Sequence, residues 1–308
     1  MGHRRLCHTV IGMRFILVLL ILLLVLVVTF IAVLLFVLTP ADRRMLFSRS
    51  ESIVVDGAKR NYKLVNANGA DARPLIIGLH GYRDRPEWLA AYSGLHLLAE
   101  QEDAILALPQ GKQQSWNGSF CCGWAWQNNV ADTEFILEMI TAIEREQQID
   151  TSRIYLVGFS NGGILAQKLL HEQPQVFAAS ASVMSGVGDS ENILDISNAQ
   201  APLLLINGTK DNYVPLAHPL QTNDFSFLPA FDTSSTWAEH YGLGERQSSQ
   251  KGDYTEYTWA DDTDQKLVQR IYPTSHRWPE WRLWSMPGDV PNSTQDMWEF
   301  LQSKRLDE

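Results

Sequence analysis

A serine flanked by two glycines is the residue of this chain best suited to chemistry. Residues 158–162 read Gly-Phe-Ser-Asn-Gly, so Gly158 and Gly162 stand two positions before and after Ser160. An apolar run precedes the motif and a segment with helical periodicity follows it. A serine on a sharp strand-to-helix turn presents its hydroxyl clear of the sheet, and such a strained turn needs neighbours without bulk. The pattern predicts a nucleophile, and the alternative is a surface serine in a glycine-rich turn.

A serine hydroxyl attacks a carbonyl only when a base takes its proton, and that base is usually a histidine oriented by a carboxylate. After such a turn the partners follow in the order acid, then histidine, each on a loop after a later strand. Asp211 follows the apolar run 203–207, and His276 follows the run 266–272. We therefore predict Asp211 as the acid and His276 as the base. The weaker alternatives follow no strong apolar strand, lie too close to the acid or fall within an expected helix: Asp189, Asp195, Asp224, His218 and His240.

Two backbone N–H groups are needed to bind the negative charge that develops on an attacked carbonyl oxygen. One is expected from Asn161, the residue after the nucleophile. The other is expected from the loop after the apolar run 75–79, where the sequence reads His-Gly-Tyr and the N–H of Tyr82 is placed to serve. Gly81 allows the backbone to approach closely there.

The elements that position these residues alternate between short apolar strands and helices. Such alternation predicts a mostly parallel sheet with helices on both faces. A hairpin is expected over 50–66, around the turn Asp56-Gly57. Further strands are expected at 75–79, 104–108, 154–157, 177–184, 203–207 and within 254–272, and helices at 95–100, 128–148, 164–170, 233–241 and 293–303. For Asp132, near the start of the helix at 128–148, we predict a structural role at the positive end of the helix dipole.

The N-terminus contains 24 uncharged, mostly apolar residues, 15–38. As a helix this run is about 36 Å long, enough to cross a hydrocarbon core of about 30 Å. It is longer than the apolar part of most cleaved signals and no small-residue cleavage site follows, which favours a signal anchor; a cleaved leader and a start at Met13 are the alternatives. We predict a tail at 1–14, a transmembrane anchor at 15–38, a linker at 39–50 and one catalytic domain at 51–308.

Charge and cysteine content limit the possible partners and scaffolds. Three of the 25 basic residues and none of the 35 acidic ones precede residue 39, which leaves 22 basic against 35 acidic residues, a net charge of −13. Nucleic-acid binding favours a basic face, so we expect no such partner. Cys121 and Cys122 are the only cysteines in the expected domain, too few for a disulfide scaffold or a cysteine zinc site. As adjacent residues they form either a vicinal disulfide or two free thiols.

Several spaced blocks together resemble the polyhydroxybutyrate depolymerase and feruloyl esterase group of the α/β-hydrolases. The blocks are His80-Gly81-Tyr82, Pro109-Gln110-Gly111, Cys121-Cys122-Gly123-Trp124, Gly158-Phe159-Ser160-Asn161-Gly162-Gly163, Asp211 with Val214-Pro215, and His276 with Trp278-Pro279. The resemblance covers residues 53–301 and implies an α/β-hydrolase fold and a serine carboxylic-ester hydrolase without a metal or other cofactor. The departures are Thr274-Ser275 where members often carry two glycines before the histidine, fewer cysteines, and the N-terminal anchor.

The resemblance implies esters of hydroxyalkanoates or their oligomers as substrates, with feruloyl or acetyl esters of polysaccharide as the alternative. It also places the domain outside the cytoplasm, periplasmic or extracellular, whereas the arginines on the two sides of the anchor balance and give no orientation. Tryptophans in the loops near the serine are candidates to line a substrate pocket, with Trp124 and Trp278 chosen first and Trp116, Trp126, Trp281 and Trp284 beside them. A peptidase or thioesterase on the same fold, and a tethered binding protein without catalysis, are the rival functions.

Overall fold

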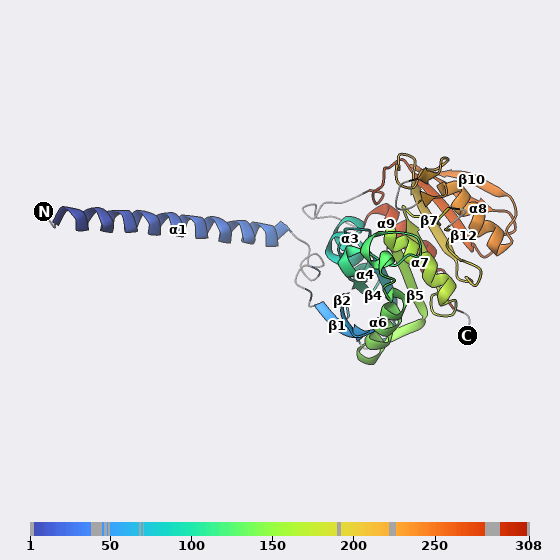
Figure 1. The fold of residues 1–308 in the computed structure, drawn as a ribbon, viewed down its shortest axis with the longest axis horizontal. Coiled ribbons are helices and arrows are strands. Elements are labelled where there is room, and N and C mark those ends of the chain that lie inside the picture. The colour runs from blue at the N-terminus through green and yellow to red at the C-terminus, as the bar shows by residue number, and fades with distance from the viewer. Residues whose placement is uncertain are drawn as a thin grey trace.

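The computed structural model describes residues 3–37, 45, 48, 50–67, 69, 71–189, 192–221, 226–280 and 290–306. Within these residues a ten-stranded sheet runs through the folded body, in the order β1-β2-β4-β3-β5-β6-β7-β12-β11-β10 (Figure 1). The strands are β1 (Ser50–Val55), β2 (Ala58–Val65), β3 (Arg73–Leu79), β4 (Ile105–Pro109), β5 (Ile149–Phe159), β6 (Ala179–Val183), β7 (Leu203–Gly208), β10 (Arg246–Lys251), β11 (Tyr254–Trp259) and β12 (Leu267–Tyr272). A separate pair joins β8 (Leu220–Gln221) and β9 (Ser226–Phe227).

The centre of the sheet is parallel, and its two margins are antiparallel hairpins. β4, β3, β5, β6, β7 and β12 pair in parallel, so their carboxyl ends meet at one edge. The β1–β2 hairpin turns at Asp56-Gly57, both with positive φ, as expected from the sequence. The opposite hairpin includes β10, an all-polar strand with all six residues exposed, which the sequence pattern did not predict.

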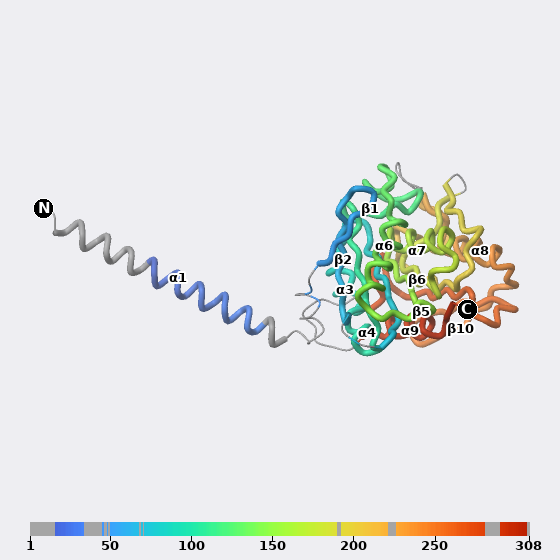
Figure 2. The backbone as a smooth tube through the Cα atoms, turned by 90° about the horizontal axis from the view of Figure 1, so that it is seen from below, coloured from blue at the N-terminus to red at the C-terminus, as the bar shows by residue number. Residues whose placement is uncertain are grey.

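Helices cover both faces of the sheet, as the alternation of elements predicts. One core lies under α6 (Asp132–Glu146), α7 (Asn161–Glu172) and α8 (Ala230–Tyr241), and the other lies under α3 (Pro86–Ser93), α4 (Leu95–Gln101) and α9 (Asn292–Gln302). β3 shows the alternation, since Leu75 and Ile77 face the first core and Ile76 faces the second. The tube in Figure 2 follows α6, α7 and α8 beside the central strands.

Helix α6 begins four residues later than the expected start at Asn128. Residues 123–127 form a separate short helix, α5 (Gly123–Gln127), and the 3₁₀ turn η1 (Lys112–Gln114) precedes it. The N–H of Asn128 donates to the carbonyl of Trp124 at the end of α5, and the next residue, Asn129, has a φ of 45°. This left-handed residue ends the short helix and lets the chain turn before Asp132.

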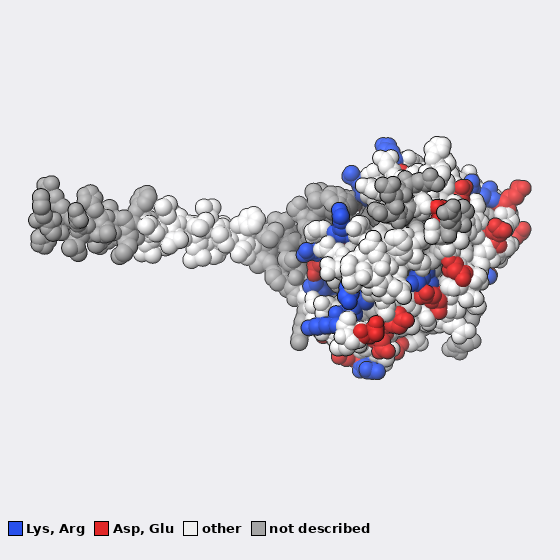
Figure 3. Space-filling view, viewed as in Figure 1, with Lys and Arg blue, Asp and Glu red and all other residues white. Residues whose placement is uncertain are grey.

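Helix α1 (His3–Val37) lies outside the folded body in Figures 1 and 2. Its segment Ile16–Val33 has a mean hydropathy of 3.6 and none of it is buried in the protein, so by length and composition it is able to cross a membrane. Figure 3 shows these side chains without charge, whereas acidic and basic side chains are interspersed on the face of the folded body that it presents.

Candidate active site

Ser160 occupies the sharp turn between β5 and α7. Its backbone has φ 52° and ψ −119°, a conformation that side-chain-bearing residues rarely adopt. The turn is held because the Ser160 N–H donates to the carbonyl of Val183 at the end of β6. A strained serine at the carboxyl edge of a parallel sheet is the geometry predicted from the sequence.

The two glycines of the motif are required by close backbone contacts. A Cβ added at Gly158 would lie 2.3 Å from the carbonyl oxygen of Gly162. A Cβ added at Gly162 would lie 2.1 Å from the carbonyl oxygen of Leu79, at the end of β3. Neither contact involves a side chain that can move away. The first turn of α7 therefore packs directly on the ends of the two central strands.

The structure brings Ser160, His276 and Asp211 together in one line of hydrogen bonds. Ser160 Oγ lies 2.9 Å from His276 Nε2, and His276 Nδ1 lies 2.8 Å from Asp211 Oδ2. Asp211 comes from the loop after β7, and His276 comes from the loop after β12, the neighbouring strand. The three residues join here because their parallel strands all end at the same edge.

The carboxylate of Asp211 is buried and fixed by the backbone of its own loop. Its Oδ1 accepts from the N–H groups of Tyr213 and Val214, at 2.7 and 3.0 Å. This leaves Oδ2 for His276 alone among the side chains described. The ring of Tyr213 also lies against the imidazole of His276, with centroids 4.9 Å apart. The loop thus sets both the rotamer of the acid and the plane of the histidine.

Two backbone segments approach the serine where the oxyanion donors are expected. A Cβ at Gly81 would lie 3.0 Å from the ring of Phe159 and 3.5 Å from the Cβ of Ser160, so the chain leading to Tyr82 passes beside the serine. Asn161 is the first residue of α7, so its N–H has no partner within the helix. Both predicted donors lie on the backbone that borders Ser160.

Comparison with known proteins identifies the family to which this chain belongs. The family model for the esterase PHB depolymerase family matches residues 61–218, just over half of the chain. This chain belongs to the esterase PHB depolymerase family. The match spans the serine turn, the loop that ends in Tyr82 and the loop of Asp211, while His276 lies beyond its end.

Two curated relatives of this family member are esterases or depolymerases. A bifunctional acetylxylan esterase/xylanase, XynS20E, from Neocallimastix patriciarum is 28% identical over 250 residues, which are 78% of this chain and 32% of that protein. Poly(3-hydroxyalkanoate) depolymerase C from Paucimonas lemoignei is 30% identical over 120 residues, 37% of this chain and 28% of that protein. The chain therefore spans about a third of the length of these relatives.

A solved structure supports the fold of this family member. The acetyl xylan esterase from Aspergillus awamori superposes with a TM-score of 0.60 at 13% identity, over 83% of this chain and all of that one. The fold is that of the α/β-hydrolases, as the sequence predicts. Among the described residues, no group of three or more His, Cys, Asp or Glu side chains is placed to hold a metal ion.

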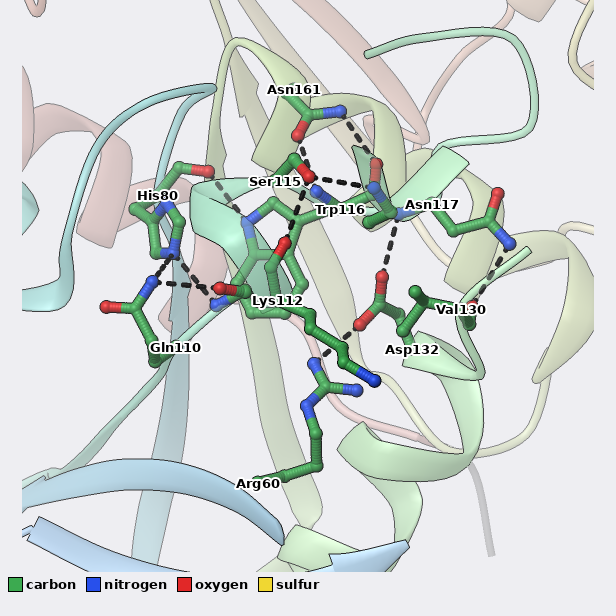
Figure 4. Close-up of polar contacts among 12 residues, drawn as sticks. Arg60, His80, Gln110, Lys112, Ser115, Trp116, Asn117, Val130, Asp132 and Asn161 are labelled. Atoms are coloured by element: carbon green, nitrogen blue, oxygen red, sulfur yellow. Dashed lines mark hydrogen bonds and ion pairs between the residues drawn. The ribbon is translucent and has the colours of Figure 1, made fainter. Parts of the chain in front are cut away.

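Trp116 braces both backbone segments beside the serine, a role that sequence reasoning missed (Figure 4). Its indole N–H donates to the carbonyl of His80, just before Gly81. Its backbone N–H donates to Asn161 Oδ1 at 2.8 Å, and its carbonyl accepts from Asn161 Nδ2 at 3.1 Å. The same amide donates to the carbonyl of Cys121, so the loop 115–121 wraps around the side chain of Asn161.

His80 is a fully buried, neutral histidine that supports the same region. Its Nδ1–H donates to the carbonyl of Gly81 at 2.8 Å, and its Nε2 accepts from the N–H of Gly111 at 3.0 Å. Because an N–H donor points at Nε2, the proton of the neutral ring belongs on Nδ1. Burial lowers the pKa of His80 to about 4. The sequence signal for this role was its position directly before Gly81.

The buried His80 makes the stability of the fold depend on pH. Its pKa is about 4 in the folded chain, below the ordinary 6.5, so as pH falls the unfolded chain takes up the proton first. The neutral ring therefore costs the folded chain nothing above pH 6.5. As pH falls from 6.5 through 4, the free energy of unfolding decreases by up to about 3 kcal/mol. Urea unfolding at several pH values should show a shallower dependence for His80→Gln than for the wild type. Parallel curves for the two proteins would contradict this assignment.

The two tryptophans first chosen for substrate contact differ in exposure. Trp124 in α5 is 40% exposed, and the ammonium of Lys112 lies 5.2 Å from its ring. Trp278 is 1% exposed and donates to Thr294 Oγ1, so it packs behind the histidine loop and is not accessible to a substrate. Trp116 is also buried, Trp126 is partly buried, and Trp281 and Trp284 lie outside the described residues. Cys121 and Cys122, at the end of the loop that wraps Asn161, form a vicinal disulfide.

Proposed function

We propose that this chain is a serine carboxylic-ester hydrolase, with Ser160 as nucleophile, His276 as base and Asp211 as the acid that orients it. The observation that carries the proposal is the pair of contacts of His276, 2.9 Å to Ser160 Oγ and 2.8 Å to Asp211 Oδ2. A histidine held by a buried carboxylate on one nitrogen presents the other as a proton acceptor. Membership of an esterase family supports the same reaction.

The reaction would proceed in two acyl transfers. Ser160 Oγ attacks the ester carbonyl carbon while His276 Nε2 takes the hydroxyl proton. The N–H groups of Tyr82 and Asn161 donate to the oxyanion. Collapse of the intermediate breaks the ester C–O bond, and His276 gives the proton to the leaving alcohol. Water then attacks the acyl-enzyme with His276 again as base, which releases the acid and restores Ser160.

For the substrate we propose hydroxyalkanoate esters or oligomers, as the family description suggests. Acetyl or feruloyl esters of polysaccharide are the second candidate, because the acetylxylan esterase relative aligns with 78% of this chain. Trp124 is the proposed contact for the substrate, since its ring is half exposed near the loop that wraps Asn161. No cofactor or metal takes part in the proposed reaction.

The proposed setting is a membrane, with residues 15–38 as the anchor and residues 51–308 as the catalytic domain outside the cytoplasm. The apolar helix is long enough to cross a bilayer. A leader that is cleaved would release the same domain as a secreted enzyme.

The test of this function is hydrolysis of p-nitrophenyl esters, from acetate to long chains and including ferulate, by the full chain in detergent. We expect turnover, together with labelling by a fluorophosphonate probe that peptide mass analysis assigns to Ser160. The chain-length optimum would indicate the size of the acyl pocket. Labelling without ester turnover would favour a peptidase or thioesterase, and a folded protein that neither labels nor turns over would favour a binding protein.

A further inference from the structure

A buried carboxylate lies outside the three proposed catalytic residues and is linked to their surroundings. Asp132, at the start of α6, is 1% exposed, and its Oδ1 lies 2.6 Å from the guanidinium of Arg60, itself 4% exposed on β2. Its Oδ2 accepts from the N–H of Asn117 at 2.7 Å. Both oxygens are therefore used, one by a charge and one by a peptide group of the loop that wraps Asn161.

The peptide group that Asp132 holds joins Asn117 to Trp116. Figure 4 shows the resulting chain of contacts, from Arg60 through Asp132 and the Trp116–Asn117 segment to Asn161. The backbone of Trp116 forms two hydrogen bonds with the side chain of Asn161, and its indole N–H donates to the carbonyl of His80. A shift of this one segment would move the backbone on both sides of Ser160.

We propose that Asp132 is a positioning residue for the oxyanion hole, acting through the N–H of Asn117 to hold the Trp116 backbone against Asn161. The inference rests on the function proposed above, because it concerns how the two N–H donors of that reaction are held. Asp132 touches neither the serine nor the substrate in this role. It reaches the side-chain amide of Asn161 through two consecutive contacts, from Asp132 to the Asn117 N–H and from the Trp116 backbone to Asn161. Arg60 keeps the charge of Asp132 compensated in the interior.

The remaining contacts of Asn117 explain why the carboxylate is needed. Its side chain donates to the carbonyl of Val130 and to Asn129 Oδ1, and its own carbonyl accepts from Lys168 Nζ at 3.2 Å. These bonds tie the residue to α7 and to the connection between α5 and α6, but they leave its N–H to Asp132. A buried N–H without an acceptor would favour a different loop position, in which water reaches it.

The experiment compares two double variants of the full chain that differ in one acceptor. Both replace Arg60 by Met, which removes the buried cation. Arg60→Met with Asp132→Asn keeps an oxygen for the Asn117 N–H, whereas Arg60→Met with Asp132→Leu removes it and fills the space with an apolar group. We expect kcat on a p-nitrophenyl ester to be about 10- to 100-fold lower for the leucine version, since losing one oxyanion donor entirely costs about 100- to 1,000-fold.

A second readout separates positioning from mere loss of stability. A trifluoromethyl ketone forms a tetrahedral adduct with Ser160, so its inhibition constant should rise by the same factor as kcat falls, with KM changed less than about threefold. Thr133→Val is the matched control. Thr133 follows Asp132 in the chain and donates to Glu172, so this variant removes one hydrogen bond of α6 and none of the hydrogen bonds of Asn117. That variant should lose stability and keep its kcat.

Equal kcat values for the two double variants, or a loss confined to KM or to thermal stability, would overturn the role of Asp132. The single variant Asp132→Asn supplies the same comparison with the wild type if the leucine version does not fold, because its one amide oxygen cannot serve both Arg60 and the Asn117 N–H. A wild-type chain without Ser160-dependent hydrolysis would instead contradict the proposed function. The two failures are therefore distinguishable.

Discussion

Replacing Ser160 with alanine is expected to lower kcat for an activated ester by about a million-fold, the loss typical of removing a triad nucleophile. Alanine cannot form the acyl-enzyme, and its methyl group leaves the strained turn and the packing of α7 unchanged. His276→Ala should lose as much, because without a base the hydroxyl that lies 2.9 Å away is not activated. The double variant should be no worse than either single one, since the residues act as a unit.

Initial rates at high enzyme concentration measure these losses, with circular dichroism and thermal unfolding as the check on folding. The residual rate would come from binding and from the backbone donors of Tyr82 and Asn161 alone. A Ser160→Ala protein that keeps wild-type turnover would falsify the proposed mechanism. Losses that multiply in the double variant would mean that the serine and the histidine act independently.

The Asp211→Asn variant is expected to lower kcat by about 10⁴-fold while the fold is preserved. The N–H groups of Tyr213 and Val214 both point at Oδ1, so the amide oxygen of asparagine must take that place. Its NH₂ group then faces His276 Nδ1, which can only accept from it. The ring proton moves to Nε2, and that nitrogen is no longer able to take the proton of Ser160.

Measured kcat for Asp211→Asn and for Asp195→Asn tests this choice of acid. Asp195 was an alternative acid from the sequence, but its side chain is 68% exposed and pairs with His171. We expect the Asp195 variant to retain wild-type kcat. The reverse pattern, with Asp195→Asn inactive and Asp211→Asn active, would contradict the assignment.

The sequence predicted the elements that carry strong patterns. Strands β3 and β7 are buried along their whole length and β5 is buried over residues 154–158, so their apolar runs are continuous and easy to find. β10 has no such pattern, because all six of its residues are exposed at the edge of the sheet. It pairs with β11 along the backbone of their hairpin, and composition does not reveal such pairing.

For the site, chain order was sufficient to propose Ser160, Asp211 and His276, because parallel strands bring their following loops to one edge. The burial of individual side chains could not be predicted from chain order in the same way. The sequence placed Trp278 and Trp124 alike, in loops expected near the serine, yet Trp278 is in the core and Trp124 lies in α5 with its ring 40% exposed. Asp132 was predicted to serve the dipole of its helix. Its contacts to Arg60 and Asn117 span 72 and 15 residues, and such pairs depend on the packed fold rather than on local sequence.

Helix α1 ends at Val37 and β1 begins at Ser50, so residues 38–49 are the only covalent link between them. Twelve fully extended residues span at most about 40 Å. In the anchored arrangement proposed above, this tether keeps the first strand within that distance of the bilayer. The catalytic domain would then reach only those substrates that come within this thin layer over the membrane, whereas an untethered enzyme would diffuse through the surrounding solution. Soluble oligomers reach such a layer by their own diffusion, whereas a bulky insoluble particle has to be brought to the cell.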